Sequence, residues 1–207
     1  LMDGPGRPPA VIWIPATLVA AALALPPVYL VLRAAESGAD AWEILFRVRI
    51  LQILIRTFLL VGAVTLTSVL LAVPLAWLTV RTDLPLRRVW AVATALPLVI
   101  PSYVAGFIVV AALGPKGMLQ GALEGPFGID RLPDIHGYAG ALLTLTFLSF
   151  PYVVLTVRAA MLRIDPAMEE SSRGLGRGNW TTFFFVTLPL LRPGIAAGGL
   201  LVALYTL

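Results

Sequence analysis

The chain has no cysteine, one histidine (His136) and one lysine (Lys116) among its 207 residues. Without cysteine it can form neither disulfide bonds nor thiolate metal sites, and one histidine cannot build a histidine cluster, so we expect no metal and no cofactor. Lys116 is followed by Gly117, so the Gly-Lys-Ser/Thr end of a phosphate-binding P-loop is missing. ATP would have to be hydrolysed by another polypeptide. The Gly-x-Ser-x-Gly and His-Glu-x-x-His patterns of hydrolases are also absent.

Charged residues are scarce as well, at 13% of the chain against 59% hydrophobic residues. An ordinary soluble domain carries about 25% charged residues, so we expect lipid to surround much of this chain. The net charge of +4 would suit a nucleic-acid partner, but the arginines stand between apolar runs instead of forming one basic face with aromatic residues. We therefore expect no nucleic-acid partner and assign the arginines to membrane topology.

Long uncharged apolar runs predict an all-α membrane protein, a polytopic transmembrane helix bundle in the lipid bilayer. A bilayer core of about 30 Å requires about 20 apolar residues in a helix. Four runs are complete, and a fifth stops at Leu207 with too few residues to cross, so we expect a fragment of a longer protein. Residues 1–207 then form a single, partial transmembrane domain with spans at about 11–32, 57–80, 89–113, 138–157 and, truncated, 191–207.

The first run has an alternative interpretation as a secretory signal peptide. Arg7 precedes it, and Ala22-Leu23-Ala24 is similar to a cleavage site. The apolar pattern continues past Pro26 and Pro27, however, which favours a retained helix that is bent or interrupted near its outer end.

Arginine placement predicts the orientation, because short loops rich in arginine stay in the cytoplasm. With the spans numbered in order, the arginines at 81–88 and 158–192 lie on the same side as the N-terminus, which we expect to be cytoplasmic. Three further arginines argue the other way, but they lie within residues 40–56, where helical apolar spacing predicts an amphipathic helix on the outer interface. Residues 114–137, rich in glycine and proline, are either an external loop or a short re-entrant element.

The segment between the fourth and fifth runs predicts a short acidic helix. Asp165 is a good N-cap, and Pro166 suits the first helical position. Glu169 and Glu170 lie near the start of this helix, where the helix dipole favours negative charge. A glycine at 174 or 176 can adopt the left-handed conformation that ends it.

A second helical piece is expected after this short helix. Asn179 is a candidate N-cap for it, and aromatic residues follow. Leu188-Pro189 should mark a break into the fifth span.

The same segment resembles the binding-protein-dependent ABC importer permeases. Their signature reads Glu-Ala-Ala, three residues, Gly, nine residues, Ile, one residue, Leu-Pro. The residues that match at this spacing are Glu170, Ser171, Ser172, Gly176, Val186, Leu188 and Pro189. Valine replaces isoleucine, and two serines replace the alanines, which preserves a close approach but adds hydroxyl groups.

The resemblance implies a type I ABC importer permease fold. In that family the loop, here residues 165–189, fits a groove on a cytoplasmic ABC ATPase dimer and transmits ATP-driven closure, and Glu170 would pair with a basic residue of the ATPase. A second permease half or subunit, an extracytoplasmic substrate-binding protein and a bacterial inner membrane are implied too. The candidate docking residues are Glu169, Glu170, Ser171, Ser172, Arg173, Gly176, Val186, Leu188 and Pro189. A solvated connecting helix is the alternative, and Arg173 also serves as an inside-retaining charge.

Three further motifs resemble the ferric-iron branch of this family. They are residues 74–78 with Arg81-Thr82-Asp83, residues 96–104, and Phe150-Pro151-Tyr152. The resemblance implies ferric iron as the substrate and a chain that is the first half of a fused permease. Thiamine, polyamine, phosphonate, sulfate and molybdate importers are the alternatives.

Prolines inside the third run indicate a candidate translocation path, because they free backbone carbonyls that only a protein interior or a watered cavity can satisfy. The candidate residues are Pro97, Pro101, Ser102, Tyr103, Ser149 and Tyr152, with helix packing as the alternative role for each. The four complete runs lack the Asp, Glu, Lys and His residues that carry protons across membranes. An ATP-independent transporter or channel, and a membrane scaffold or enzyme, are the competing classes.

Overall fold

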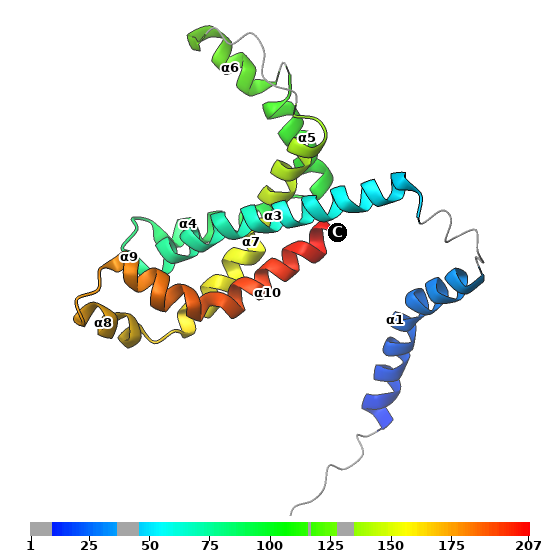
Figure 1. Cartoon of the computed structure of the whole chain (residues 1–207), viewed down its shortest axis with the longest axis horizontal. Helices are drawn as coiled ribbons and strands as arrows, with labels where there is room; N and C mark the ends of the chain where they lie inside the picture. The colour runs from blue at the N-terminus through cyan, green and yellow to red at the C-terminus, as the bar shows by residue number, and fades with distance from the viewer. Residues whose placement is uncertain (1–9, 37–45, 116, 128–134) are drawn as a thin grey trace, which may run out of the picture. The chain divides into compact units, whose positions relative to one another are not determined.

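The computed structural model describes residues 10–36, 46–115, 117–127 and 135–207, and all regular structure within these ranges is helical (Figure 1). The elements are α1 (Ala10–Glu36), α3 (Val48–Arg81), α4 (Arg87–Ala93), the 3-10 helix η1 (Leu96–Val99), α5 (Ser102–Leu113), α6 (Met118–Phe127), α7 (Tyr138–Arg163), α8 (Pro166–Gly174), α9 (Asn179–Thr182), the π-helix η2 (Phe183–Thr187) and α10 (Leu188–Thr206). Five stretches are long and apolar enough to cross a membrane: Ile12–Glu36, Val48–Arg81, Ser102–Glu124, Tyr138–Arg163 and Asn179–Thr206. The predicted all-α fold class is confirmed.

The chain divides into two compact units, Leu1–Leu54 and Ile55–Leu207. In the first, α1 continues as a helix through Pro26 and Pro27 to Glu36, and its side chains from Ile12 onward are exposed. The helix is therefore not interrupted at these prolines, and Figure 1 shows α1 as a bent helix, which was the other form of the prediction. The second unit holds the packed core.

The helix predicted at residues 40–56 is present over residues 48–56, where it is continuous with α3 and not a separate helix, and its place on an interface stays a prediction. Residues 48–56 form the first turns of α3, while residues 40–45 lie outside the described ranges. The helix is uninterrupted because no proline occurs between Val48 and Pro74. At 1.5 Å per residue its 34 residues extend about 51 Å, well beyond a bilayer core of about 30 Å.

The third predicted span, residues 89–113, is not one helix. The chain passes from α4 through η1 into an extended turn at Ile100 (φ −82°, ψ 121°) before α5 begins at Ser102. The cause is local, because Pro101 drives the residue before it out of the helical region. The candidate span shifts to Ser102–Glu124, and α6 occupies part of the segment predicted as an external loop or re-entrant element.

The fifth span is longer than predicted. Helix is continuous over Asn179–Thr206, and its 28 residues are enough to cross a bilayer. The sequence predicted a break at Leu188-Pro189, but the helix continues through these two residues. The π-helix η2 ends at Thr187, two residues before Pro189, and its wider turn lets the helix continue past a residue that has no N–H to donate.

The core of the second unit is built from valine, alanine and leucine side chains of α3, α7 and α10. Its fully buried members include Val64 and Ala76 on α3, Val153 on α7 and Leu191 on α10. Two hydroxyl pairs join α3 to α7: Thr67–Thr146 at 2.9 Å and Ser68–Ser149 at 3.3 Å between oxygens. Small residues and hydroxyl pairs replace the hydrophobic effect as the means of holding helices together in lipid.

Two glycines, four residues apart, allow α10 to lie against α7, and Figure 1 shows the two helices side by side. A Cβ on Gly194 would lie 2.6 Å from the Cβ of Ala160. A Cβ on Gly198 would lie 2.8 Å from the Cα of Val153 and would also collide with the Thr156 hydroxyl. The backbone of α7 therefore requires glycine at position 198.

We predict that Gly198→Ala destabilises the folded chain, because the new methyl group meets backbone that cannot give way. Overpacking of this kind costs about 1–3 kcal/mol. The matched control is Gly62→Ala on α3, where a Cβ meets nothing within 4 Å, and which should be neutral or slightly stabilising through helix propensity. Denaturant titration of the purified protein in detergent measures both. Equal stabilities of the two variants would contradict the close α7–α10 contact.

Candidate functional site

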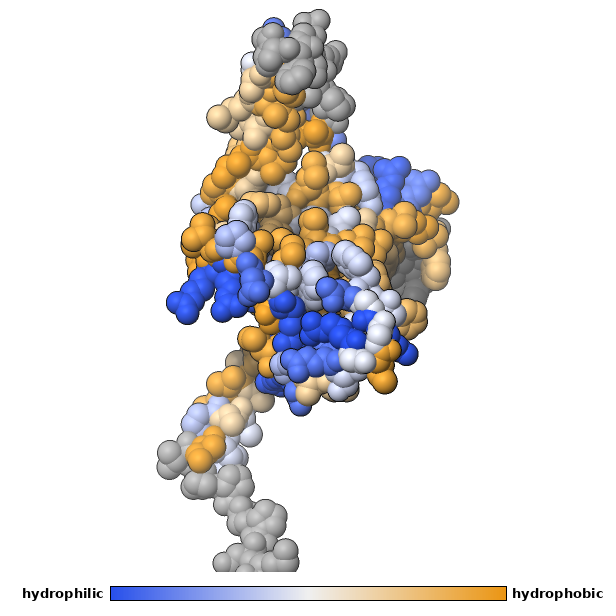
Figure 2. All heavy atoms as spheres, turned by 90° about the vertical axis from the view of Figure 1, so that its left-hand side faces the viewer, coloured by the Kyte–Doolittle hydropathy of each residue, from blue (hydrophilic) through white to orange (hydrophobic). Residues whose placement is uncertain are grey.

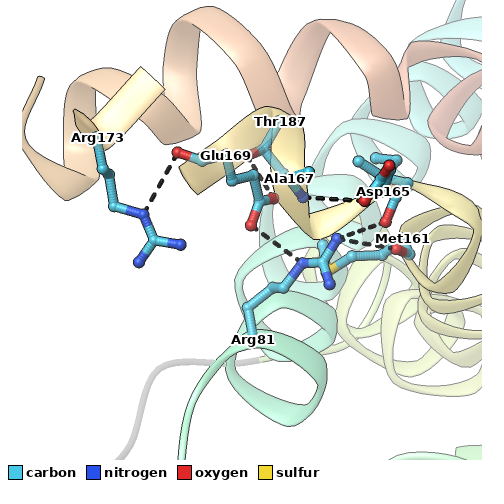
Figure 3. A network of polar contacts seen from close by, with 8 residues as sticks. Arg81, Met161, Asp165, Ala167, Glu169, Arg173 and Thr187 are labelled. Carbon is cyan, nitrogen blue, oxygen red and sulfur yellow. Dashed lines mark hydrogen bonds and ion pairs between the residues drawn. The ribbon is translucent and has the colours of Figure 1, made fainter. Parts of the chain in front are cut away.

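The candidate site lies at the end of the second unit where α3, α7, α8 and η2 come together. Arg81, the last residue of α3, reaches the last turn of α7 and the short helix α8 (Figure 3). The two arginine-bearing loops thus lie at one end of the bundle, as the numbering of the spans predicted. Figure 2 looks at this end and shows hydrophilic side chains gathered on it, surrounded by hydrophobic ones.

The local chemistry of α8 follows the sequence prediction. An Asp165 side-chain oxygen accepts a hydrogen bond from the Ala167 N–H at 3.0 Å, and Pro166 is the first helical residue. The helix ends at Gly174, and Gly176 has the left-handed φ of 84° that favours glycine. The predicted cap and terminator are confirmed. The prediction for Asn179 is wrong by one position, because Gly178 occupies the N-cap of α9 and Asn179 is its first residue.

Helix α8 has two faces with different surroundings, and they divide the predicted docking residues. Glu169 and Ser172 are buried, three residues apart on the face toward the bundle. Ser172 pairs with the Thr182 hydroxyl of α9 at 3.1 Å between oxygens. The exposed members are Glu170, Ser171, Arg173 and Gly176, whereas Val186, Leu188 and Pro189 are half-buried in η2 and α10.

The carboxylate of Glu169 is held by two residues from other elements. Its Oε2 lies 3.3 Å from the Nε of Arg81, and the two groups form an ion pair. The geometry of this contact is not that of a hydrogen bond. Its Oε1 accepts a hydrogen bond of 2.8 Å from the Thr187 hydroxyl in η2. Glu169 was predicted as a docking residue, and the structure places its carboxylate on the inner face of α8, where it is held within the chain.

Arg81 also closes the end of α7. Its Nη2 donates to the carbonyls of Ile164 at 3.0 Å and Met161 at 3.3 Å. The last carbonyls of a helix have no partner within the helix and carry the negative end of its dipole, so a guanidinium there is favourable. From the sequence, Arg81 was assigned only to the arginines that set the membrane orientation and to a motif shared with the ferric-iron branch of the family. Its partners are distant in sequence, and no local pattern identifies them.

Aromatic side chains line the bundle beside this network. The Trp77 ring of α3 lies 5.6 Å from Phe183 and 6.2 Å from Trp180, measured between ring centroids. A cavity of about 370 Å³ opens beside Trp77 and Phe183, and its lining also includes the charged residues Arg81, Glu169 and Arg173. The inner face of α8 thus meets packed aromatic and charged groups.

The predicted translocation residues lie in different surroundings in this chain, and their role in a translocation path stays a prediction. Ser149 is fully buried, and its hydroxyl pairs with Ser68 in the α3–α7 interface. Pro97 is buried in η1, which contacts α7, whereas Tyr103 at the start of α5 is 71% exposed. Pro101 and Ser102 are exposed beside it, and Tyr152 lies against Tyr205 of α10 at 5.7 Å between ring centroids.

Curated relatives of this chain are transport permeases. It is 36% identical over 126 residues to the molybdenum transport system permease protein ModB of Escherichia coli, covering 61% of this chain and 54% of that protein. It is 32% identical over 204 residues to the Fe(3+)-transport system permease protein FbpB 2 of Haemophilus influenzae, covering 98% and 37%. It is 32% identical over 177 residues to a probable sulfate transport system permease protein cysT of Chlorokybus atmophyticus, covering 85% and 60%. The chain spans less than two thirds of each of these relatives.

Solved structures show the same fold at lower identity. A bacterial ABC transporter involved in the import of the acidic polysaccharide alginate superposes with a TM-score of 0.68 at 20% identity, covering 89% of this chain and 70% of that one. A bacterial alginate ABC transporter in complex with an alginate pentasaccharide-bound periplasmic protein gives a TM-score of 0.65 at 21% identity, covering 89% of this chain and 72% of that one. The model of the family described as "binding-protein-dependent transport system inner membrane component" matches residues 68–207, which include α8 and the helices that anchor it. The chain therefore belongs to this family of inner-membrane transport components.

Proposed function

We propose that this chain is a permease subunit of an ATP-driven ABC importer, in which α8 docks onto a cytoplasmic ATPase subunit that carries out the ATP hydrolysis. The observation that carries this proposal is the arrangement of α8. Its inner face is fixed by Glu169 and Ser172, which leaves Glu170 and Ser171 projecting from a short helix at the polar end of the bundle. An exposed helix with a fixed base can transmit force into the membrane helices.

The partners follow from the same proposal. They are a cytoplasmic ABC ATPase dimer, a second permease half or subunit, and an extracytoplasmic substrate-binding protein. Family membership supports all three, and the solved alginate transporter binds a periplasmic protein. The end that carries α8 is proposed to be cytoplasmic, because both arginine-bearing loops lie there, and the N-terminus is proposed to lie on the same side.

We predict that Glu170→Lys weakens docking, because it places a cation where the ATPase is proposed to supply one. Like-charge contacts in an interface cost several kcal/mol, so affinity for the ATPase should fall at least about tenfold. The matched control is Glu124→Lys on α6, which makes the same charge change on an exposed residue outside the α8 region. Co-purification and titration of the ATPase with the assembled permease measure the effect.

Equal ATPase binding by Glu170→Lys and the control would contradict docking through the exposed face of α8. Because the ATPase is cytoplasmic, loss of binding in Glu170→Lys alone also supports the proposed orientation.

For the substrate we propose ferric iron, with the oxyanions molybdate and sulfate as the second candidates. The ferric-iron permease of Haemophilus influenzae aligns over nearly the whole chain, which supports the first. The molybdenum permease of Escherichia coli is slightly more similar over a shorter region, and the sulfate permease aligns over most of the chain. The external binding protein is proposed to select among these ions, as the family resemblance implies.

The importer is assembled in proteoliposomes and supplied with its cognate binding protein. It should take up radioactive Fe(III) only when ATP is present on the side of the membrane where the ATPase is bound. Molybdate and sulfate serve as controls in the same vesicles. ATP-dependent uptake of either oxyanion and not of iron would contradict the iron proposal, while leaving the importer proposal intact. Equal uptake with and without ATP would contradict the importer and favour a channel.

A further inference from the structure

The ion pair between Arg81 and Glu169 is buried under α8, and a short helix does not need such a pair in order to be stable. Glu169 is 7% exposed, and the side chain of Arg81 is 16% exposed. Removing two charges from water is costly, and apolar residues of similar volume often serve stability equally well. A connecting helix that only needed to fold could retain its N-cap and present both glutamates to water.

The pair joins four elements through two side chains, as Figure 3 shows. Arg81 ends α3 and donates to the last carbonyls of α7, while Glu169 lies in the first turn of α8. Thr187 closes the connection from η2, directly before α10. Any displacement of α8 must therefore move these helix ends or break a buried contact.

We propose that Arg81 is a positioning residue that, through Glu169, couples the docking helix to the membrane helices. This inference rests on the proposed importer function and adds the route by which motion leaves α8. The exposed face bearing Glu170 and Ser171 contacts the ATPase, and the opposite face transfers the displacement to Arg81 and Thr187. Because α8 has only nine residues, its two faces move together.

The π-helix η2 supplies a second feature of this route. π-helical turns are rare and frequently occur at functional sites. Here the wide turn of residues 183–187 ends at Thr187, whose hydroxyl donates to Glu169. Ser172 makes a parallel contact to Thr182, so α8 is joined at two points to the continuous helix that becomes α10. The coupling then reaches α3 and α10 at once.

The test uses the fully assembled importer with Arg81→Gln, Glu169→Gln and the double variant. Glu169→Gln removes the charge but retains a side-chain oxygen that can accept from Thr187, so it guards against simple misfolding. The matched control is Arg88→Gln, an exposed arginine on α4. The measurements are ATPase affinity, basal ATP hydrolysis, and the stimulation of hydrolysis by the substrate-loaded binding protein.

We expect both single variants to bind the ATPase within about twofold of wild type, while stimulation falls at least about tenfold. The double variant should be no worse than either single variant, because residues that act as one unit are not additive. The control should retain wild-type stimulation.

Three results would overturn the inference: unchanged stimulation in Arg81→Gln, loss of ATPase binding in step with stimulation, or additive defects in the double variant. The second result would mean that the pair only keeps α8 folded. If the wild-type permease itself bound no ATPase, the proposed function would fail together with this inference. Wild-type binding with unchanged stimulation in the variants would remove the inference alone.

Discussion

The ion pair between Arg81 and Glu169 is the constraint on which the polar end of this bundle depends. A carboxylate this deeply buried is tolerated only with a charge partner and hydrogen bonds, and Arg81 and Thr187 provide them. The guanidinium in turn satisfies the last carbonyls of α7. These contacts fix four parts of the structure relative to one another: the ends of α3 and α7, the inner face of α8 and the end of η2.

The membrane imposes the second constraint, which explains how the rest of the unit is held together. In lipid, apolar side chains gain little by leaving their surroundings, so helices associate through close packing and hydrogen bonds. Gly198 brings α10 onto α7, and the Ser68–Ser149 pair joins α7 to α3. These contacts make the three helices a frame against which α8 can be fixed. The three-helix frame and the Arg81–Glu169 ion pair together hold α8 in one position at the polar end of the bundle.

Local chemistry in the sequence was enough to predict α8. Its cap at Asp165 and its left-handed glycine at 176 depend only on neighbouring residues, and both are found. The prediction of the third span failed because it rested on the number of consecutive apolar residues. That number does not reflect that Pro101 forces Ile100 into an extended conformation. The fifth span was predicted too short because a break was assigned at Pro189, which the π-turn accommodates.

The division of α8 into two faces could not be predicted, because it depends on contacts between residues far apart in the sequence. Glu169 and Glu170 are adjacent and chemically identical, yet one is buried against Arg81 and the other is exposed. The docking motif matches Glu170 and not Glu169, but its spacing does not indicate which of the two is buried. The inward-facing residues emerge only when the ends of α3, α7 and η2 are brought together.

The central claim is that α8 and the ends of the membrane helices move as one rigid unit, and a distance measurement tests it most directly. Since the chain has no cysteine, spin labels at Met168→Cys, an exposed residue at the side of α8, and Asp83→Cys beyond α3 would be the only ones it carries. In the assembled importer, pulsed electron resonance should give the same narrow distribution of distances without nucleotide and with bound ATP. A distribution that shifts or broadens when ATP binds would contradict the rigid unit.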